Sequence, residues 1–184
     1  MGKYRVCVYA ICKNEAQFVD RWMNSMSEAD RVVVLDTGSE DGTVEKLRAR
    51  GAEVTVEAIS PWRFDTARNR SLELTPEDTD ICVCTDLDEV FHPGWRQALE
   101  QVWVPGAGQV SYRYTWSFNA DGSEGVVFWY EKIHARQGYR WVHPVHEVLR
   151  WVGEGSPGPM VTAENIQLDH HPDPAKSRSQ YLPL

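Results

Sequence analysis

The sequence lacks a long hydrophobic run and is short of basic residues. Its first apolar run, YRVCVYAI, is too short for a signal peptide or a membrane-spanning helix, and Val6 does not fit the N-myristoylation pattern. The 19 Lys and Arg residues are outnumbered by 27 Asp and Glu, and the net charge of −8 argues against the broad basic face that nucleic acids require. We therefore expect a soluble, cytoplasmic protein with no membrane span and no direct contact with nucleic acid.

Cysteine is also scarce. The four cysteines, Cys7, Cys12, Cys82 and Cys84, form no C-x-x-C pair of the kind that zinc ribbons use. Each lies in or beside an apolar run, where a free thiol packs as a small hydrophobic group. Buried, reduced thiols are therefore predicted.

The N-terminal half alternates β-branched apolar runs with segments of helical periodicity. Strands are predicted at 4–11, 31–36, 52–59 and 80–86, and helices at 14–26, 43–50 and 65–74. In the first helix, Phe18, Trp22 and Met26 recur at helical spacing. Repeated βα units predict an α/β fold, with a mixed, mainly parallel sheet flanked by helices on both faces.

The C-terminal half has a different pattern. A helix is predicted at 93–103, an antiparallel hairpin at 109–118 and 126–133 around the turn NADG, and a short strand in NIQLDHH. Pro and Gly in 138–160 indicate loops. We expect a single domain over 1–184, in which an α/β half (1–91) is joined without an obvious linker to a mixed half rich in Trp and Tyr (92–184). The chain stops at YLPL within a predicted helix, so we expect a protein shortened at its C-terminus.

Polar side chains follow each of the four predicted N-terminal strands. In an open α/β sheet, ligands bind beyond the carboxyl ends of the strands, near the point where the strand order reverses. The carboxylates there are Glu15, Asp36, Asp86 and Asp88, and the guanidinium groups are Arg63, Arg68 and Arg70. Carboxylates can hold a cation or bind a nucleoside, and arginines can pair with phosphate, so the set suits a nucleoside diphosphate with a divalent metal. Taken singly, Asp36 fits loop hydrogen bonding equally well, and DLD also fits an acidic turn.

Four motifs carry a family resemblance. AICKNEAQFVDRWMNSM, VVVLDTGSEDGT, FDTARNRSLE and CTDLDEVF, in this order, resemble the family 2 glycosyltransferases, which have the GT-A nucleotide-sugar fold. The resemblance implies that Asn14 and Glu15 line the nucleotide pocket, and that Asp36 contacts the uracil or ribose. It also implies that Arg68 lies beside the base or phosphates. DLD would be the DxD motif, with Asp86 near the ribose and metal, and Asp88 a direct ligand of Mn²⁺ or Mg²⁺.

The second half is similar to a bacterial and phage-type branch of the same family in VHPVHEVL and LDHHPDP. Glu147 is the predicted general base, and His146 is the alternative because the pKa of a free imidazole is nearer neutrality. Glu147 could instead begin a helix through HEVLRW. His170 shares a strand face with Ile166 and Leu168, which makes it the candidate for a third metal ligand, with a structural role as the alternative.

The resemblance implies an inverting transfer of a sugar from a nucleotide diphosphate, with UDP expected, to an unknown acceptor hydroxyl. A sugar-nucleotide pyrophosphorylase normally opens with a glycine-rich phosphate loop, which YAICKNEAQF does not provide. A non-catalytic carbohydrate-binding module would keep the aromatic residues without needing the metal. The chain has neither the Glu-Asp pair nor the Gln-x-x-Arg-Trp motif of many family members, so a processive polymerase is not expected.

Overall fold

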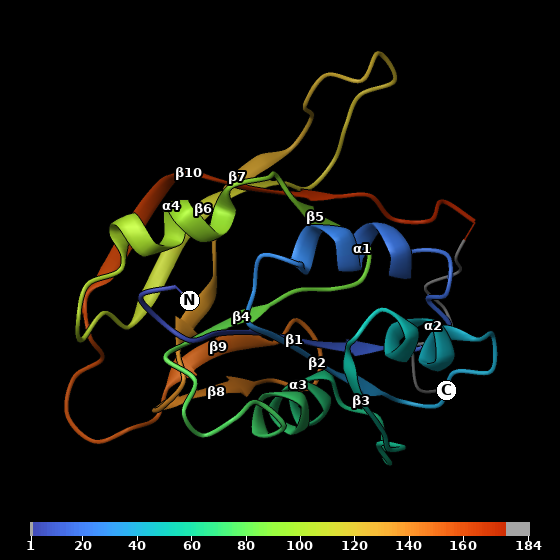
Figure 1. Ribbon diagram of the computed structural model, residues 1–184, viewed down its shortest axis with the longest axis horizontal. Coiled ribbons are helices and arrows are strands. Elements are labelled where there is room, and N and C mark those ends of the chain that lie inside the picture. The colour runs from blue at the N-terminus through green and yellow to red at the C-terminus, as the bar shows by residue number, and fades with distance from the viewer. Residues whose placement is uncertain (1, 176–184) are drawn as a thin grey trace.

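The computed structural model describes residues 2–175 (Figure 1). The helix predicted at the C-terminus lies outside the described residues. The elements in chain order are β1 (Val6–Cys12), α1 (Val19–Met26), β2 (Arg31–Asp36), α2 (Thr43–Ala49), β3 (Glu53–Val56), α3 (Phe64–Glu73), β4 (Ile81–Cys84), β5 (Glu89–Phe91), α4 (Trp95–Val102), β6 (Gln109–Thr115), β7 (Val127–Ala135), β8 (Tyr139–Val142), β9 (Val148–Trp151) and β10 (Met160–His170). The strands and helices predicted for the N-terminal half are thus confirmed to within a few residues at their ends.

Eight of these strands form one sheet in the order β3-β2-β1-β4-β7-β6-β10-β5. Strands β1 to β4 run parallel to one another, whereas β7 is antiparallel to both β4 and β6. The predicted mixed, mainly parallel sheet is confirmed. Every residue of β1 is buried, because its apolar side chains meet a packed layer on each face of the sheet.

The helices cover both faces of the sheet (Figure 1). On one face, Trp22 and Met26 of α1 join Val8 of β1 in the main core, together with residues from α2 and α4. On the other face, Leu72 of α3 packs with Tyr9 of β1 and with residues of β8. The helical spacing predicted for α1 is confirmed, since its repeated apolar residues are all buried.

Two hairpins complete the fold. The β6–β7 hairpin was predicted and is confirmed, and it projects from the body of the molecule in Figure 1. The β8–β9 hairpin corrects two expectations, because residues 138–160 are not all loop, and HEVLRW contains no helix but ends in the strand β9 (Val148–Trp151). Tyr139 and Trp141 alternate inward along β8, a strand pattern that Pro144 and the neighbouring glycines masked in the sequence.

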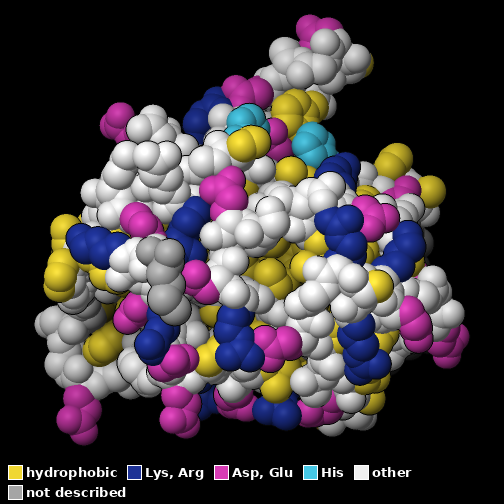
Figure 2. Space-filling model, in the orientation of Figure 1, with side chains coloured by type: hydrophobic (Ala, Val, Ile, Leu, Met, Phe, Trp, Pro, Cys, Tyr) yellow, Lys and Arg dark blue, Asp and Glu magenta, His cyan; other side chains and the backbone are white. Residues whose placement is uncertain are grey.

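The remaining expectations concern the cysteines, membrane-spanning helices and the charge on the surface. All four cysteines are free and buried, as predicted. Within residues 2–175, no helix combines the length and hydropathy that a membrane crossing requires. Acidic and basic side chains are interspersed on the face shown in Figure 2, without a continuous basic area.

Candidate active site

A cavity of about 600 Å³ opens at the carboxyl ends of β1 and β4. The chain winds from β1 to β2 and β3 on one side and then returns to place β4 on the other, so the strand order reverses at this point. That is where open α/β sheets bind ligands. The cavity is lined by most of the predicted site residues, namely Glu15, Arg68, Asp86, Asp88, His146, Glu147 and His170.

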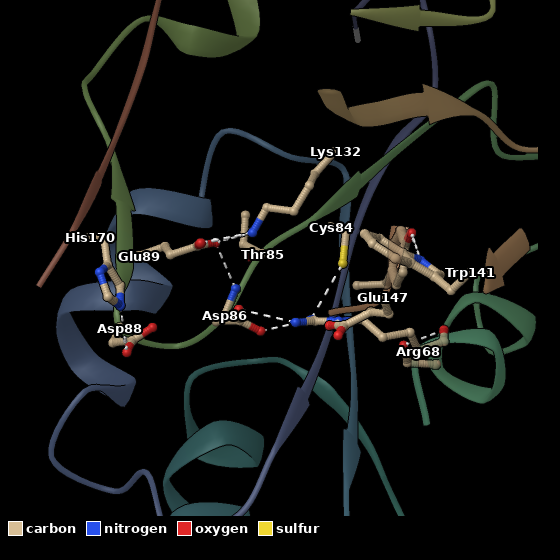
Figure 3. Close-up of polar contacts among 12 residues, drawn as sticks. Arg68, Cys84, Thr85, Asp86, Asp88, Glu89, Lys132, Trp141, Glu147 and His170 are labelled. Carbon is tan, nitrogen blue, oxygen red and sulfur yellow. Dashed lines mark hydrogen bonds and ion pairs between the residues drawn. The ribbon is translucent and has the colours of Figure 1, made fainter. Parts of the chain in front are cut away.

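Asp88 and His170 meet because β5 pairs with β10. In this antiparallel pair Glu89 lies opposite His170, and the adjoining Asp88 carboxylate comes within 3.2 Å of His170 Nε2. His170 Nδ1 donates to the carbonyl oxygen of Trp116 at 3.0 Å, which directs Nε2 toward Asp88 (Figure 3). Burial lowers the pKa of His170, but the hydrogen bond and charge of Asp88 outweigh it and raise the pKa above its ordinary value.

This pair has the chemistry of a metal site. A carboxylate oxygen and an imidazole nitrogen oriented through its second nitrogen are suitable ligands for Mn²⁺, and Mg²⁺ binds to one or two carboxylates plus substrate phosphates. Within residues 2–175, no group of three or more His, Cys, Asp or Glu side chains is placed to hold a metal ion. The protein residues therefore fit a cation held by Asp88 and His170, with further ligands supplied by a bound diphosphate.

Asp86 is directed toward Arg68 instead. Arg68 comes from α3, and its two terminal nitrogens donate to the Asp86 oxygens at 2.7 and 3.1 Å. Burial would raise the pKa of Asp86, but the charges of Arg68 and Lys132 hold it well below its usual range, so the carboxylate is ionised. The guanidinium group thus occupies both Asp86 oxygens. The contacts predicted for Asp86 with the ribose and the metal stay predictions.

Glu147 joins the same cluster. Its carboxylate accepts a hydrogen bond from Arg68 Nε at 2.9 Å, so one guanidinium group contacts both the predicted base and Asp86 of the DLD segment. The β8–β9 hairpin is fixed to α3 by Asn69, whose side chain bonds both the backbone N–H and the carbonyl of Trp141 at 2.9 and 2.8 Å. His146 precedes Glu147 with a φ of 55° and also lines the cavity.

A series of hydrogen bonds from Tyr9 of β1 and His134 of β7 also holds Trp141 in place. His134 Nδ1 donates to the Ala135 carbonyl, so its Nε2 accepts from the Tyr9 hydroxyl at 2.8 Å. The Tyr9 oxygen in turn accepts from Trp141 Nε1 at 2.9 Å. This series of hydrogen bonds links β1, β7 and β8 and anchors the hairpin that carries Glu147.

The first two strand ends supply less to the cavity than predicted. Glu15 lines it, but Asn14 and Asp36 are not among its lining residues. The Asn14 side chain accepts a hydrogen bond from the backbone N–H of Glu40 at 2.8 Å. Asp36 is fully buried and accepts from the Ser39 backbone at 2.8 Å, which is the loop role left open for it. Their predicted contacts with the nucleotide stay predictions.

Sequence reasoning missed one buried pair. Glu89, which was not among the predicted site residues, lies in β5 and forms an ion pair with Lys132 of β7 at 2.7 Å. Lys132 alternates in phase with Phe128 and Tyr130, which also line the cavity. A lysine in phase with inward aromatic side chains was the signal that could have identified it.

Aromatic side chains line one side of the cavity. Tyr114 lies on β6 and Trp116 directly follows it, and Phe128 and Tyr130 lie on β7. Tyr114 is buried, whereas Trp116 and Phe128 are exposed as well as lining the cavity. The hairpin thus contributes both core packing and a ring surface at the cavity mouth.

Solved structures resemble this chain. A mycobacterial protein superposes with a TM-score of 0.63 over 94% of this chain and 69% of its own, at 18% identity, a similarity that concerns the fold. A mannosyltransferase from Pyrobaculum calidifontis, solved with GDP-Man and Mn²⁺, has a TM-score of 0.49 and 26% identity over 60% of this chain and 36% of its own.

The third is glucosyl-3-phosphoglycerate synthase from Mycobacterium tuberculosis, with a TM-score of 0.50 and 27% identity over 61% of this chain and 44% of its own. It was solved with Mn²⁺, UDP and glucosyl-3-phosphoglycerate, and also with Mg²⁺ and UDP. This chain spans less than half the length of each of these two transferases. The expected α/β fold of the GT-A type is confirmed. Residues 7–147, more than half of the chain, match the family model described as "Glycosyl transferase family 2", and the chain therefore belongs to this family.

Proposed function

We propose that this chain is the catalytic domain of an inverting glycosyltransferase that moves a sugar from a UDP-sugar to an acceptor hydroxyl with Mn²⁺ or Mg²⁺. The observation that carries the proposal is the meeting of three groups in one cavity: the Asp88–His170 pair, the Asp86–Arg68 pair and the separate carboxylate of Glu147. The similar synthase bound to UDP with Mn²⁺ or Mg²⁺ supports the choice of nucleotide and cation.

Asp88 and His170 would hold the cation at the donor diphosphate. The cation would neutralise charge that develops on the leaving diphosphate as the glycosidic bond to it breaks. Arg68 lies in the same cavity, where its positive charge would favour a bound diphosphate while its nitrogens hold Asp86 and Glu147.

Glu147 would act as the general base. As the acceptor oxygen forms its bond to the anomeric carbon, its proton passes to the Glu147 carboxylate, and the diphosphate leaves from the opposite face of the sugar. The hydrogen bond from Arg68 fixes the orientation of this carboxylate before an acceptor arrives. His146 is the second candidate for the role, because it lines the same cavity one residue away.

Metal-dependent nucleotide binding is the first test. Isothermal titration calorimetry with UDP should show stronger binding with Mn²⁺ than after chelation, because the diphosphate otherwise meets a cluster of carboxylates. Asp88→Asn keeps the side-chain shape and removes the charge, so it should abolish the gain from Mn²⁺ and lower transfer by about 100-fold or more.

The matched control is Asp121→Asn in the β6–β7 loop, which removes an acidic charge outside the cavity lining. It should behave as the wild-type protein does. Equal UDP affinity with and without Mn²⁺ in the wild type would remove the metal from the mechanism. Metal-dependent binding without transfer to any acceptor of a broad panel would instead indicate a non-catalytic module.

A further inference from the structure

The buried pair of Glu89 and Lys132 lies beside Asp86 and lines the same cavity (Figure 3). Glu89 is 2% exposed and Lys132 is 3% exposed. Lys132 Nζ donates to both oxygens of Glu89, at 2.7 and 2.8 Å, and lies 4.8 Å from the centre of the Tyr130 ring. Burial would lower the pKa of Lys132, but the charge of Glu89 raises it well above its ordinary value, so the lysine is charged.

Glu89 also joins the two ends of the acidic turn, residues Asp86–Glu89, through two hydrogen bonds. Its Oε2 accepts a hydrogen bond from the backbone N–H of Asp86 at 2.9 Å, and its own N–H donates to the Asp86 carbonyl at 3.1 Å. The two bonds join both ends of the turn Asp86–Glu89, in the way a capping box closes the first turn of a helix. Leu87, at the centre of the turn, is 2% exposed, and all four residues of the turn line the cavity.

This arrangement needs Lys132. Three carboxylates within four residues repel one another, and a buried carboxylate without a countercharge is strongly destabilising. The remaining Oε1 of Glu89 accepts from Lys132 and from the Tyr114 hydroxyl at 2.9 Å, so both oxygens of this carboxylate are satisfied. Burial raises the pKa of Glu89, and the donors on its two oxygens counter this effect and hold one oxygen as an acceptor for the Asp86 amide.

We propose that Glu89 and Lys132 are positioning residues that fix the acidic turn, so that Asp86 faces Arg68 and Asp88 faces His170 before the donor binds. The expected effect of the pair on the strength of nucleotide binding rests on the proposed function. The pair acts through the backbone of the turn and needs no contact with the donor.

Two double variants separate this role from general stability. Glu89→Gln/Lys132→Met removes both charges but keeps a side-chain oxygen for the Asp86 N–H. Glu89→Leu/Lys132→Met also removes both charges and leaves no acceptor. Neither variant strands a buried charge, so urea unfolding should show both to be folded.

Amide hydrogen exchange by NMR and calorimetry with UDP and Mn²⁺ are the two readouts. The Asp86 amide should be protected in the wild type and in the Gln variant, and should exchange about 10-fold or more faster in the Leu variant, as expected for a lost hydrogen bond to a buried acceptor. The Leu variant should also lose about 10-fold or more in Mn²⁺-dependent UDP affinity, which the Gln variant largely keeps. Amides of β1, measured in the same spectra, report global opening and distinguish it from a local effect.

The proposal is overturned if the Asp86 amide exchanges alike in the two variants, or if UDP affinity is the same in both. A wild-type protein whose UDP affinity does not respond to Mn²⁺ removes the metal from the proposed function, and the exchange comparison then still decides whether the pair fixes the turn. A Leu variant whose β1 amides also lose protection shows that the pair stabilises the whole core, which equally overturns a specific positioning role.

Discussion

Replacing Arg68 with Met tests the centre of the site. The guanidinium group is 7% exposed and is the shared donor to Asp86, which is 38% exposed, and to Glu147, which is 14% exposed. Removing one partner of a buried ion pair costs about 3–5 kcal/mol. Water reaches Asp86 and can replace part of the lost interaction, so we expect a loss of about 2–4 kcal/mol in the free energy of unfolding.

Urea unfolding at pH 7, followed by far-UV circular dichroism, measures this loss. Arg63→Met is the matched control, because Arg63 borders the same helix and pairs with Asp65 at 2.7 Å but is 47% exposed. Because the Arg63 end of this pair is open to water, and Asp65 also accepts a hydrogen bond from the Thr66 backbone, the pair should contribute less than about 1 kcal/mol. A loss for Arg68→Met no larger than that of the control would refute the reasoning.

The pH dependence gives a second check on Arg68. The pKa of Asp86 is depressed in the folded chain, because the charges of Arg68 and Lys132 outweigh burial. The stabilisation is therefore fully present above the unfolded carboxyl pKa of about 4, and is lost as the pH falls toward the folded pKa. The difference between the wild type and Arg68→Met should shrink below about pH 4.

Two further predictions concern single residues. Glu147→Gln should leave UDP affinity with Mn²⁺ nearly unchanged and lower transfer by about 100-fold or more. Full transfer in this variant, with loss in His146→Ala, would assign the base to His146. Burial lowers the pKa of His134 from 6.5 to about 4, so unfolding, which frees the imidazole to bind a proton, is favoured as the pH drops through this range. Stability should fall by about 3 kcal/mol between pH 6.5 and 4, and by correspondingly less in His134→Gln, as measured by urea unfolding at each pH.

The N-terminal half could be predicted closely from the sequence because its strands are buried on both faces. A run such as RVVVLD has few alternatives to a central parallel strand, and it forms β2 with the predicted bounds. The β8–β9 hairpin could not be predicted in this way. Strand β8 pairs with β9, and the side chain of Asn69 holds Trp141 in place, a contact between residues 72 positions apart.

The site was predictable where it depends on strand ends. Parallel strands β1 and β4 bring their carboxyl ends to one edge, so Glu15 and the DLD loop were expected in the same crevice. His170 was placed by strand phase, but its contact with Asp88 depends on the pairing of β5 with β10. The pairing of Glu89 with Lys132 depends on the strand order of the whole sheet, which no local pattern specifies.

The structure explains how the crowded carboxylates of DLDE can coexist. Each has a different partner from a different element: Asp86 pairs with Arg68 of α3, Glu89 with Lys132 of β7, and Asp88 with His170 of β10. Guanidinium and ammonium groups offer no lone pair to a metal, whereas carboxylate and imidazole are both metal ligands. A divalent cation at Asp86 or Glu89 would have to displace a buried positive charge. At Asp88 it would find a second ligand in His170 once the imidazole releases its proton, and for this reason we propose Asp88 as the cation site.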